Sequence, residues 1–285
     1  NSLAPGFIFS QSSLQDYSDC PRRFQLRYME QLQWPAVETE PAMENERRQR
    51  EGQLFHRMVQ QYVVGIPPGK ILGQVSSPNL RRWWDNFFLN PVDLAGYAQH
   101  AEITLSAPLG ANFRLTAKYD LIAIKPATEI ILYDWKTYAK RPRDEFLAAR
   151  WQTRIYRALM IQAGTLLFGN TPIEPEFLTM VYWFAEYPTQ PARFPYSNAQ
   201  YARDTNALDS LVERSIFDQL PGVLGGKTIF IVAHRLSTVQ NSDRILLLNE
   251  KRLAAIGTHA ELLQSSPYYR SLAEEQQIWT ESEAG

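Results

Sequence analysis

Cysteine is nearly absent from this sequence, because Cys20 is the only one in 285 residues. A single cysteine excludes an internal disulfide. It also excludes any zinc or iron–sulfur site held wholly by cysteines of this chain. A reducing, cytoplasmic location is therefore the expected one.

Long apolar runs and excess charge are missing as well. No stretch reaches the roughly 18 consecutive apolar residues of a transmembrane helix. The opening residues 1–9 lack the basic segment followed by an apolar stretch that marks an export signal. The formal net charge is −1, so any contact with nucleic acid would need a local basic surface.

The chain does have enough apolar material for a full core. Hydrophobic residues make up 45% of it and aromatic residues 12%. This length leaves room for one large domain or two small ones.

Helical and extended patterns follow one another in an order typical of an α/β protein. A helical period of apolar residues covers 10–29, 44–64, 79–89 and 143–163. Pro21 predicts that the first of these is two short helices or a kinked one. Segments rich in Ile, Leu, Tyr and Thr predict strands at 100–107, 113–124, 129–136 and 177–187. Turn-like residues separate the first three strands, which predicts an antiparallel meander.

Two aspartates and a lysine fall inside this meander. If the second hairpin turns about Ala127, Lys125 pairs with Glu129 and, five pairs further on, Asp120 faces Asp134. Directly opposed side chains on antiparallel strands lie about 5 Å apart. Lys136 shares the face of Asp134 because side chains alternate along a strand.

Charges at these positions need a partner, because the flanking residues are apolar on both faces of the strands. An unpaired buried charge is costly, and two carboxylates set opposite each other destabilise a sheet. Mg²⁺ or Mn²⁺ is the natural compensating cation, and a neighbouring lysine can position or activate water or stabilise developing charge. The alternative is that Asp120, Asp134 and Lys136 form ordinary salt bridges at strand ends.

Five short motifs occur in order across residues 7–187: 9–14 with 20–24, then 52–56, 116–122, 134–137 and 152–156. In this order they resemble the PD-(D/E)XK nuclease superfamily, in particular its RecB-like branch, which includes the CRISPR-adaptation exonucleases. The resemblance implies a restriction-endonuclease-like α/β core, in which helices flank a mixed sheet, preceded by N-terminal helices.

The resemblance also implies roles for particular residues. His56, Asp120, Asp134 and the backbone carbonyl of Trp135 would hold the metal, and Lys136 would be catalytic with the two aspartates. Gln152 and Tyr156, which share a helix face at i and i+4, would orient the active site and the substrate.

Each outer motif has an ordinary alternative. His56 could be a surface or core histidine, and Gln152 with Tyr156 could be packing. Possible DNA contacts are Arg22, Arg23 and Arg27, although a solvated basic face explains these arginines equally well.

One departure from the branch concerns Cys20. In many members the equivalent cysteine joins three C-terminal cysteines around a 4Fe-4S cluster, and this sequence lacks those three. No such cluster is expected here, and the link that it makes between the two ends of the fold is missing.

The end of the chain follows a different pattern, in residues 206–210, 226–239 and 257–263. These segments resemble the last third of an ABC-transporter nucleotide-binding domain. By resemblance Asp209 is the D-loop aspartate and His234 the γ-phosphate sensor. A phosphate-binding glycine loop is missing, because Pro221 stands where the first glycine of G-x-x-x-x-G-K-[ST] is needed. We expect no ATP hydrolysis from this segment.

The sequence therefore predicts two parts, a nuclease domain at 1–203 and an ABC-type fragment at 204–285. The expected activity is Mg²⁺- or Mn²⁺-dependent hydrolysis of DNA, exonucleolytic or directed at single strands, of a repair or recombination type. DNA is the expected partner, with a helicase or repair complex possible. Two alternatives stay open: a DNA-binding module or fusion remnant that cuts nothing, and a transporter ATPase fragment, against which the missing phosphate loop and membrane spans argue.

Overall fold

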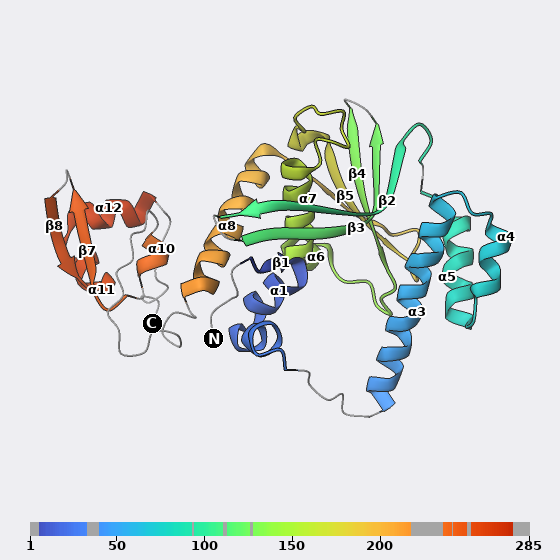
Figure 1. Ribbon diagram of the computed structural model, residues 1–285, viewed down its shortest axis with the longest axis horizontal. Helices are drawn as coiled ribbons and strands as arrows, with labels where there is room; N and C mark the ends of the chain where they lie inside the picture. The colour runs from blue at the N-terminus through green and yellow to red at the C-terminus, as the bar shows by residue number, and fades with distance from the viewer. Residues whose placement is uncertain are drawn as a thin grey trace. The chain divides into compact units, whose positions relative to one another are not determined.

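The structure is a computed structural model that describes residues 6–32, 40–92, 94–110, 113–125, 128–217, 236–240, 242–249 and 252–275. It divides into two compact units, Ala4–Ala207 and a second that contains Leu208–Gly285. Both are drawn in Figure 1, and each is described by itself.

Six strands of the first unit form one mixed sheet. They are β1 (Ile8–Ser10), β2 (Ala98–Leu109), β3 (Phe113–Lys125), β4 (Glu129–Lys136), β5 (Leu178–Phe184) and β6 (Ala192–Pro195). Along one edge, the long strand β3 pairs antiparallel with β2. Along its other edge, β3 pairs antiparallel with β4 and parallel with β1. β5 runs parallel to β4, and β6 antiparallel to β5. The predicted meander is confirmed, and so is the α/β class with a mixed sheet.

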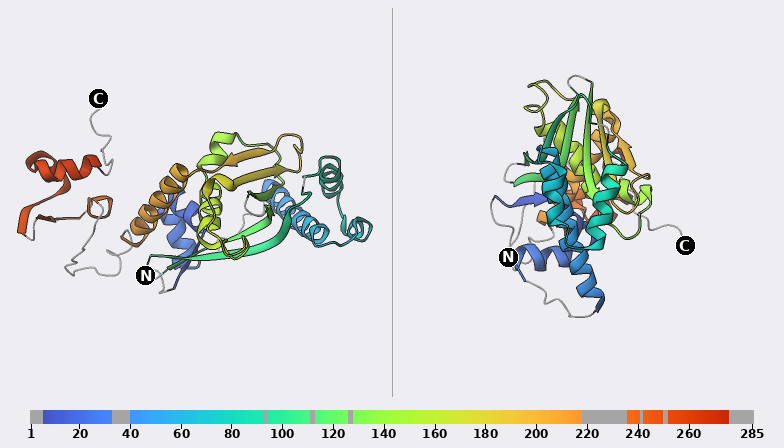
Figure 2. Two further views of the ribbon diagram at one scale, coloured as in Figure 1. Left: turned by 90° about the horizontal axis from the view of Figure 1, so that it is seen from above. Right: turned by 90° about the vertical axis from the view of Figure 1, so that its right-hand side faces the viewer.

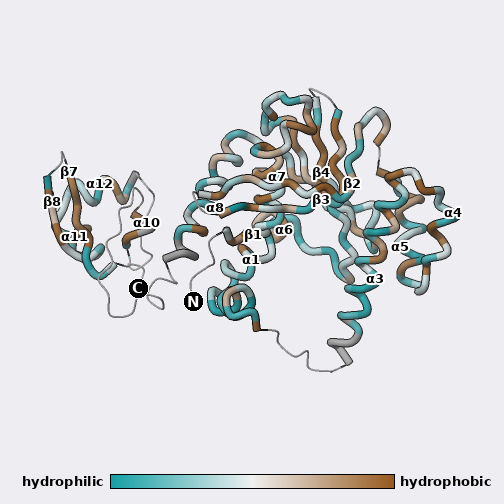
Figure 3. Tube along the Cα trace, in the orientation of Figure 1, coloured by the Kyte–Doolittle hydropathy of each residue, from teal (hydrophilic) through white to brown (hydrophobic). Residues whose placement is uncertain are grey.

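Helices cover both faces of this sheet. α3 (Glu40–Val63) and α5 (Pro78–Leu89) pack on alternate residues of the central strands, which form one apolar cluster with them. α7 (Trp151–Ala163) contacts β2, β3 and β5 from the other face. Figure 2 shows α3 and α5 grouped together. Figure 3 shows the centre of the sheet as hydrophobic, as a sheet covered on both faces requires.

Local sequence explains where the first helices begin. Ser10 and Ser13 form a reciprocal capping box at the start of α1 (Gln11–Asp19). Pro21 then starts the short α2 (Pro21–Phe24), which continues into the π-helical turn η1 (Gln25–Met29), so the predicted break at Pro21 is confirmed. The first residue of α5 is Pro78, and Ser77 caps the helix because its hydroxyl accepts a hydrogen bond from the Leu80 amide.

The single long helix predicted at 143–163 is wrong. Arg150 is extended (φ −66°, ψ 142°) and separates α6 (Asp144–Ala149) from α7. The first amide of α7, that of Trp151, donates to Gln15 Oε1 at 3.2 Å, and the Thr153 hydroxyl donates to the Leu147 carbonyl at 2.5 Å. Side chains here satisfy backbone groups that a continuous helix would pair internally.

Other boundaries differ from the sequence-based prediction. The strand predicted at 177–187 is the shorter β5, preceded by a 3-10 turn, η3 (Pro175–Phe177). Short elements without a strong period went unpredicted: β1, β6, α4 (Pro68–Ile71) and the 3-10 turn η2 (Leu72–Gln74). Residues 33–41 are polar and contain Pro35 and Pro41, which predicts a linker, and this segment lies almost wholly outside the described residues.

The second unit is small. α8 (Asn198–Phe217) runs through the division between the units. The other elements found among the described residues of this unit are α10 (Leu236–Val239), β7 (Ile245–Asn249), β8 (Arg252–Gly257), α11 (His259–Ser265) and α12 (Pro267–Glu275). A capping box between Thr258 and Glu261 starts α11. One face of the β7–β8 hairpin packs on a core that includes Leu262 and Tyr269. Its outer face exposes Leu246, Leu248, Leu253 and Ile256. Among the described helices, none has the length and apolar character needed to cross a membrane.

Candidate active site

Asp120 lies where the pairing of β3 is interrupted on both sides. β2 and β3 pair in one register from Ala98–Ile124 to Leu109–Phe113, except at the position where Glu102 faces Asp120. Glu102 has a left-handed backbone there (φ 58°). The β3–β4 ladder follows the predicted register as far as Leu121–Tyr133 and ends one pair before Asp120 and Asp134.

Side-chain alternation also changes at this point. The hydroxyl of Tyr119 donates to the Tyr156 carbonyl of α7 at 2.8 Å, whereas Leu121 belongs to the cluster with α3 and α5. Two residues apart on a regular strand would face the same side. The interruption lets Asp120 lie between two strands that separate.

The Asp120 carboxylate uses that position to bind two groups. Oδ2 accepts the backbone amide of Trp135 at 2.8 Å, in place of the backbone of β3, and Oδ1 lies 3.2 Å from His56 Nδ1 on α3. The sequence prediction that His56 and Asp120 share a site agrees with this contact.

Asp134 and Lys136 form a second, adjacent group. Lys136 Nζ lies 2.6 Å from Asp134 Oδ2 and donates to Gln152 Oε1 at 3.0 Å. Gln152 Nε2 in turn donates to Asp134 Oδ1 at 2.6 Å. The amide of Gln152 therefore fixes both charged side chains of the D-x-K motif from α7.

Burial and mutual charge set the protonation of these groups. The pKa of the Asp134 carboxyl is raised to about 6, first by burial and also by the charge of Asp120, although Lys136 opposes both. Burial lowers the pKa of the Lys136 ammonium, but the charge and hydrogen bond of Asp134 together with the nearby Tyr138 and Tyr182 outweigh burial, and the net shift is upward. The pKa of His56 is likewise raised, because its contact with Asp120 outweighs its burial. Lys136 is therefore a cation at neutral pH, suited to an anionic substrate.

Tyr156 supports the site from one turn further along α7. Its hydroxyl donates to the Lys118 carbonyl at 2.8 Å, and its ring contacts that of Tyr119. The predicted pair Gln152 and Tyr156 thus faces the sheet together, Gln152 on the charged groups and Tyr156 on the backbone of β3.

The approach of α3 depends on Gly52. A Cβ at this position would stand 2.8 Å from Thr137 Oγ1, just after Lys136. Arg48, one turn before, donates to the Thr137 carbonyl at 3.0 Å and pairs with Glu186 at 2.8 Å. These contacts hold α3 against the end of β4 and place His56 one turn later beside Asp120.

The donor set has the right chemistry for a divalent ion. His56, Asp120 and Asp134 supply imidazole and carboxylate groups, and the buried Asp134 Oδ2 has an ion pair with Lys136 but no hydrogen-bond partner in the described chain. The Lys136 ammonium, 2.6 Å from this oxygen, already offers it a cation, so a divalent ion would share the carboxylate with Lys136. Within the described residues no three His, Cys, Asp or Glu side chains are already gathered as a metal cluster. His56 instead pairs with Asp120, and Lys136 with Asp134.

Other predicted residues lie in different surroundings. Arg22, Arg23 and Arg27 each pair with an acidic side chain of their own helical segment: Arg22 with Glu30, and the other two with Asp16. Asp209 lies on α8. His234 lies outside the described residues.

Two tyrosines near Lys136 were not found from the sequence. The ammonium lies 5.3 Å from the ring centre of Tyr182 and 5.7 Å from that of Tyr138. Tyr182 pairs with Asp134 across β4 and β5, a register that nothing in the sequence indicated. Tyr138 was within reach of sequence reasoning, since it follows the D-x-K motif by two residues.

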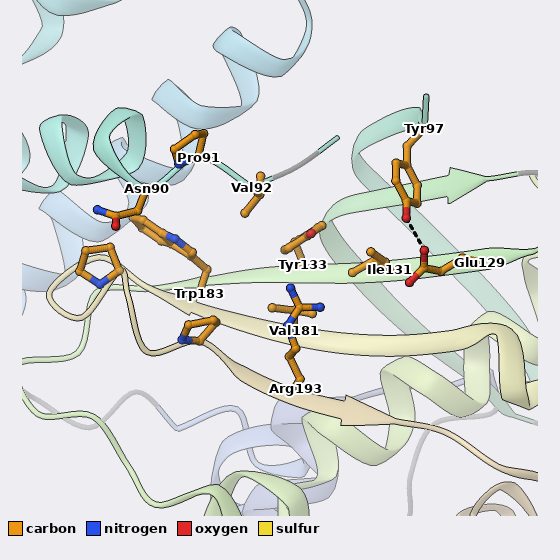
Figure 4. Close-up of a pocket in the computed structure, with 12 residues that line it drawn as sticks. Asn90, Pro91, Val92, Tyr97, Glu129, Ile131, Tyr133, Val181, Trp183 and Arg193 are labelled. Atoms are coloured by element: carbon orange, nitrogen blue, oxygen red, sulfur yellow. Dashed lines mark hydrogen bonds between the residues drawn. The ribbon is translucent and has the colours of Figure 1, made fainter. Parts of the chain in front are cut away.

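A separate hollow lies elsewhere on the sheet. It has a volume of about 520 Å³ and is bordered by Tyr97, Glu129 and Arg193, among others (Figure 4). Its floor is formed by the buried side chains Ile131, Tyr133, Val181 and Trp183. It contains none of the groups around Lys136, so it is not the site of the chemistry above.

Comparison with known proteins decides the family. Residues 8–229 match the PD-(D/E)XK nuclease superfamily. The chain belongs to this superfamily. The match includes every residue of the site around Lys136 and continues past residue 203, where the sequence predicted the nuclease part to end.

Curated relatives found by sequence are of another kind. The chain is similar to the ABC transporter ATM1 of Toxoplasma gondii, with 41% identity over 87 residues, which are 30% of this chain and 8% of that protein. It is similar to the ATP-dependent lipid A-core flippase of Cupriavidus pinatubonensis, with 46% identity over 68 residues, 24% of this chain and 12% of the flippase. The chain thus spans about a tenth of the length of these relatives.

Among solved structures, the chain is similar to a candidate exonuclease from Eubacterium rectale. The TM-score is 0.48 and the identity 9%, covering 82% of this chain and 93% of the other.

Proposed function

We propose that this protein is a metal-dependent DNA nuclease that hydrolyses phosphodiester bonds at Asp120, Asp134 and Lys136. The observation that carries the proposal is the joined arrangement of the two aspartates and the lysine. Gln152 clamps Asp134 and Lys136, and His56 meets Asp120. These are the groups that a superfamily nuclease places around its reacting phosphate.

The residues of the chain divide the work. His56, Asp120, Asp134 and the Trp135 carbonyl would hold Mg²⁺ or Mn²⁺, which when bound polarises the phosphate and lowers the pKa of water. The Lys136 ammonium stays charged and offsets negative charge that develops on the phosphate. Gln152 keeps Lys136 oriented.

The order of the five motifs supports the RecB-like branch, and with it action on free ends or single strands of DNA in repair or recombination, alongside a helicase or similar complex.

The test is degradation of labelled single- and double-stranded DNA by the purified protein with Mn²⁺ and with EDTA. Asp134→Ala and Lys136→Ala should each lose cleavage by at least about two orders of magnitude, since each removes a group acting on the transition state. Asp85→Ala is the matched control, because within the described part of the chain Asp85 forms only an exposed helix-surface pair with Arg81.

Circular dichroism of each variant separates loss of chemistry from loss of fold. Metal-dependent cleavage that both site variants lose would establish the nuclease. A folded wild-type protein that binds DNA but never cuts it would favour the alternative of an inactive binding module.

We also propose that the nuclease part is joined to a remnant of an ABC-type domain within α8. The short matches to ABC proteins support this origin for the end of the chain. Asp204, where the fragment was predicted to start, is buried and accepts from Arg154 and Arg157 of α7. The test is ATP turnover by the full chain, which we expect to be absent. Turnover that His234→Ala abolishes would overturn this expectation.

A further inference from the structure

We infer that Tyr138 is a stacking platform for a base of single-stranded DNA beside the reacting phosphate, and that Lys140 and Arg143 bind the neighbouring phosphates. The inference deepens the proposed nuclease function and rests on it for the position of the reacting phosphate. It concerns residues 137–143, the loop that joins β4 to α6.

Tyr138 is placed to meet whatever reaches Lys136. Its ring centre lies 5.7 Å from Lys136 Nζ, and the side chain is 38% exposed. Its hydroxyl makes no hydrogen bond in the described part of the chain, and its only ring neighbour there is Phe184 at 6.4 Å. An exposed ring next to the catalytic ammonium is a surface on which a planar group can stack.

Contacts with α6 and with residues 184–190 hold the loop in place. Arg141 donates to the Gln190 carbonyl at 2.8 Å, pairs with Asp144 at 2.7 Å and packs over Phe184. Tyr187 donates to the Ala139 carbonyl at 3.0 Å. A platform fixed in advance loses little conformational entropy when a ligand binds.

Charge on the loop favours an anionic strand. Lys140 and Arg143 are exposed and, among the described residues, have neither an ion pair nor a side-chain hydrogen bond. Arg141 pairs with Asp144 of α6, and residues 137–143 contain no carboxylate, so Lys140 and Arg143 are not neutralised within the loop. This differs from Arg22, Arg23 and Arg27, which are all paired with acidic groups.

Together, an exposed ring and two unpaired cations match the chemistry of a single strand. Bases stack on aromatic side chains only when they are not stacked in a duplex, and cations follow the backbone. A duplex would present its phosphates to Lys140 and Arg143 but offer no base to Tyr138.

The test separates bases from phosphates. Binding of a fluorescent twelve-residue thymidine strand is compared with binding of a base-free strand of the same length, built from abasic residues, both in EDTA so that nothing is cut. Tyr138→Ala should weaken binding of the thymidine strand by about tenfold and leave the base-free strand unchanged. Tyr138→Phe should bind as the wild type does, since the ring is retained.

Lys140→Ala and Arg143→Ala should weaken both strands alike. Each should also lower the slope of log affinity against log salt by about 0.7. Tyr268→Ala and Arg81→Ala are the controls: Tyr268 is exposed to a similar extent, 42%, and Arg81 is already paired with Asp85. Neither should change binding of either strand.

If Tyr138→Ala weakened binding of the two strands equally, the stacking role would be overturned, and the ring would only cover Lys136. No loss in any of the three variants would overturn the whole inference. Because binding is measured without cleavage, a protein that fails to cut DNA but shows the predicted difference would refute the nuclease and retain the binding surface.

Discussion

The Asp120 carboxylate accepts a hydrogen bond that a backbone carbonyl of β3 would accept in a regular ladder. Where β3 and β4 separate, its Oδ2 accepts the Trp135 amide that lacks a partner on β3, while Oδ1 meets His56. One side chain therefore has a structural task and a functional one.

Two substitutions at Asp120 should separate these tasks. Asp120→Asn keeps an oxygen for the Trp135 amide but loses the charge, so we expect a change in the free energy of unfolding below about 1 kcal/mol with loss of cleavage. Asp120→Ala leaves that amide unpaired and should also cost about 1–3 kcal/mol. Urea unfolding and the DNA assay measure the two effects; equal stability of both variants would contradict the backbone role.

Gly52 is a residue whose size is constrained, because a Cβ there would meet Thr137. Gly52→Ala should push α3 away from Thr137, costing about 1–3 kcal/mol through overpacking, and should reduce activity by moving His56. The change of Thr137→Ala in the same protein removes the Oγ1 that the new methyl group would meet, while Thr137 Cβ stands at an ordinary 3.8 Å. The double variant should regain stability and activity, and failure to do so would show that Gly52 is needed for another reason.

At the scale of elements, β2 and β3 are continuous except where Glu102 faces Asp120. The left-handed backbone of Glu102 is a conformation that costs a non-glycine residue about 1–2 kcal/mol. The strain accompanies the change of side-chain direction that puts Asp120 into the site.

In a strand, an alanine variant is usually more stable than a glycine variant, and we expect the opposite order at Glu102. Both Glu102→Ala and Glu102→Gly lose the ion pair with Lys118, but only glycine relieves the backbone, so the glycine variant should be more stable by about 1 kcal/mol. At Thr104, an exposed neighbour whose backbone is not left-handed, alanine should be the more stable. Thermal unfolding of the four variants gives the comparison, and the same ranking at both positions would refute the strain.

Asp204 joins α8 to α7. Its carboxylate, 1% exposed, accepts from Arg154 at 2.8 Å and Arg157 at 3.4 Å, and the Tyr196 hydroxyl donates to it at 3.2 Å. Removing one partner of a buried ion pair leaves the other charge without compensation.

Asp204→Ala should therefore lower the free energy of unfolding by about 3–5 kcal/mol. Asp85→Ala, which breaks an exposed pair, should cost less than about 1 kcal/mol. Chemical denaturation measures both, and similar values would mean that the Asp204 cluster contributes little.

At the scale of the whole molecule, an ion bound at the nuclease site should stabilise the unit that contains it. Mn²⁺ at 100 times its dissociation constant adds about 2.7 kcal/mol to the free energy of unfolding. Asp134→Ala should unfold at a temperature that Mn²⁺ does not change, with Asp85→Ala responding as the wild type does. A shift that persists in Asp134→Ala would place the ion elsewhere.

Sequence patterns predicted most of this architecture because strong periods and turn residues are local. The span of β4 and the β3–β4 register from Lys125–Glu129 to Leu121–Tyr133 agree with the prediction. The contacts that build the site are not local. The break at Arg150 depends on Gln15, and the position of Asp120 on the backbone of Glu102. Tyr182 lies beside Lys136 only because β5 pairs with β4.

The core beside Asp120 contains two neighbouring tryptophans, which absorb in the near ultraviolet. Trp135, whose amide binds that carboxylate, lies nearly perpendicular to Trp183 with ring centres 5.9 Å apart, and Phe87 lies between 5 and 6 Å from both. Neighbouring indoles held at a fixed angle couple their electronic transitions, and the sign and strength of the coupling depend on that angle. The near-ultraviolet circular dichroism of the unlabelled protein should therefore change when Asp120 accepts a cation, so ion loading can be followed optically in the absence of any nucleic acid.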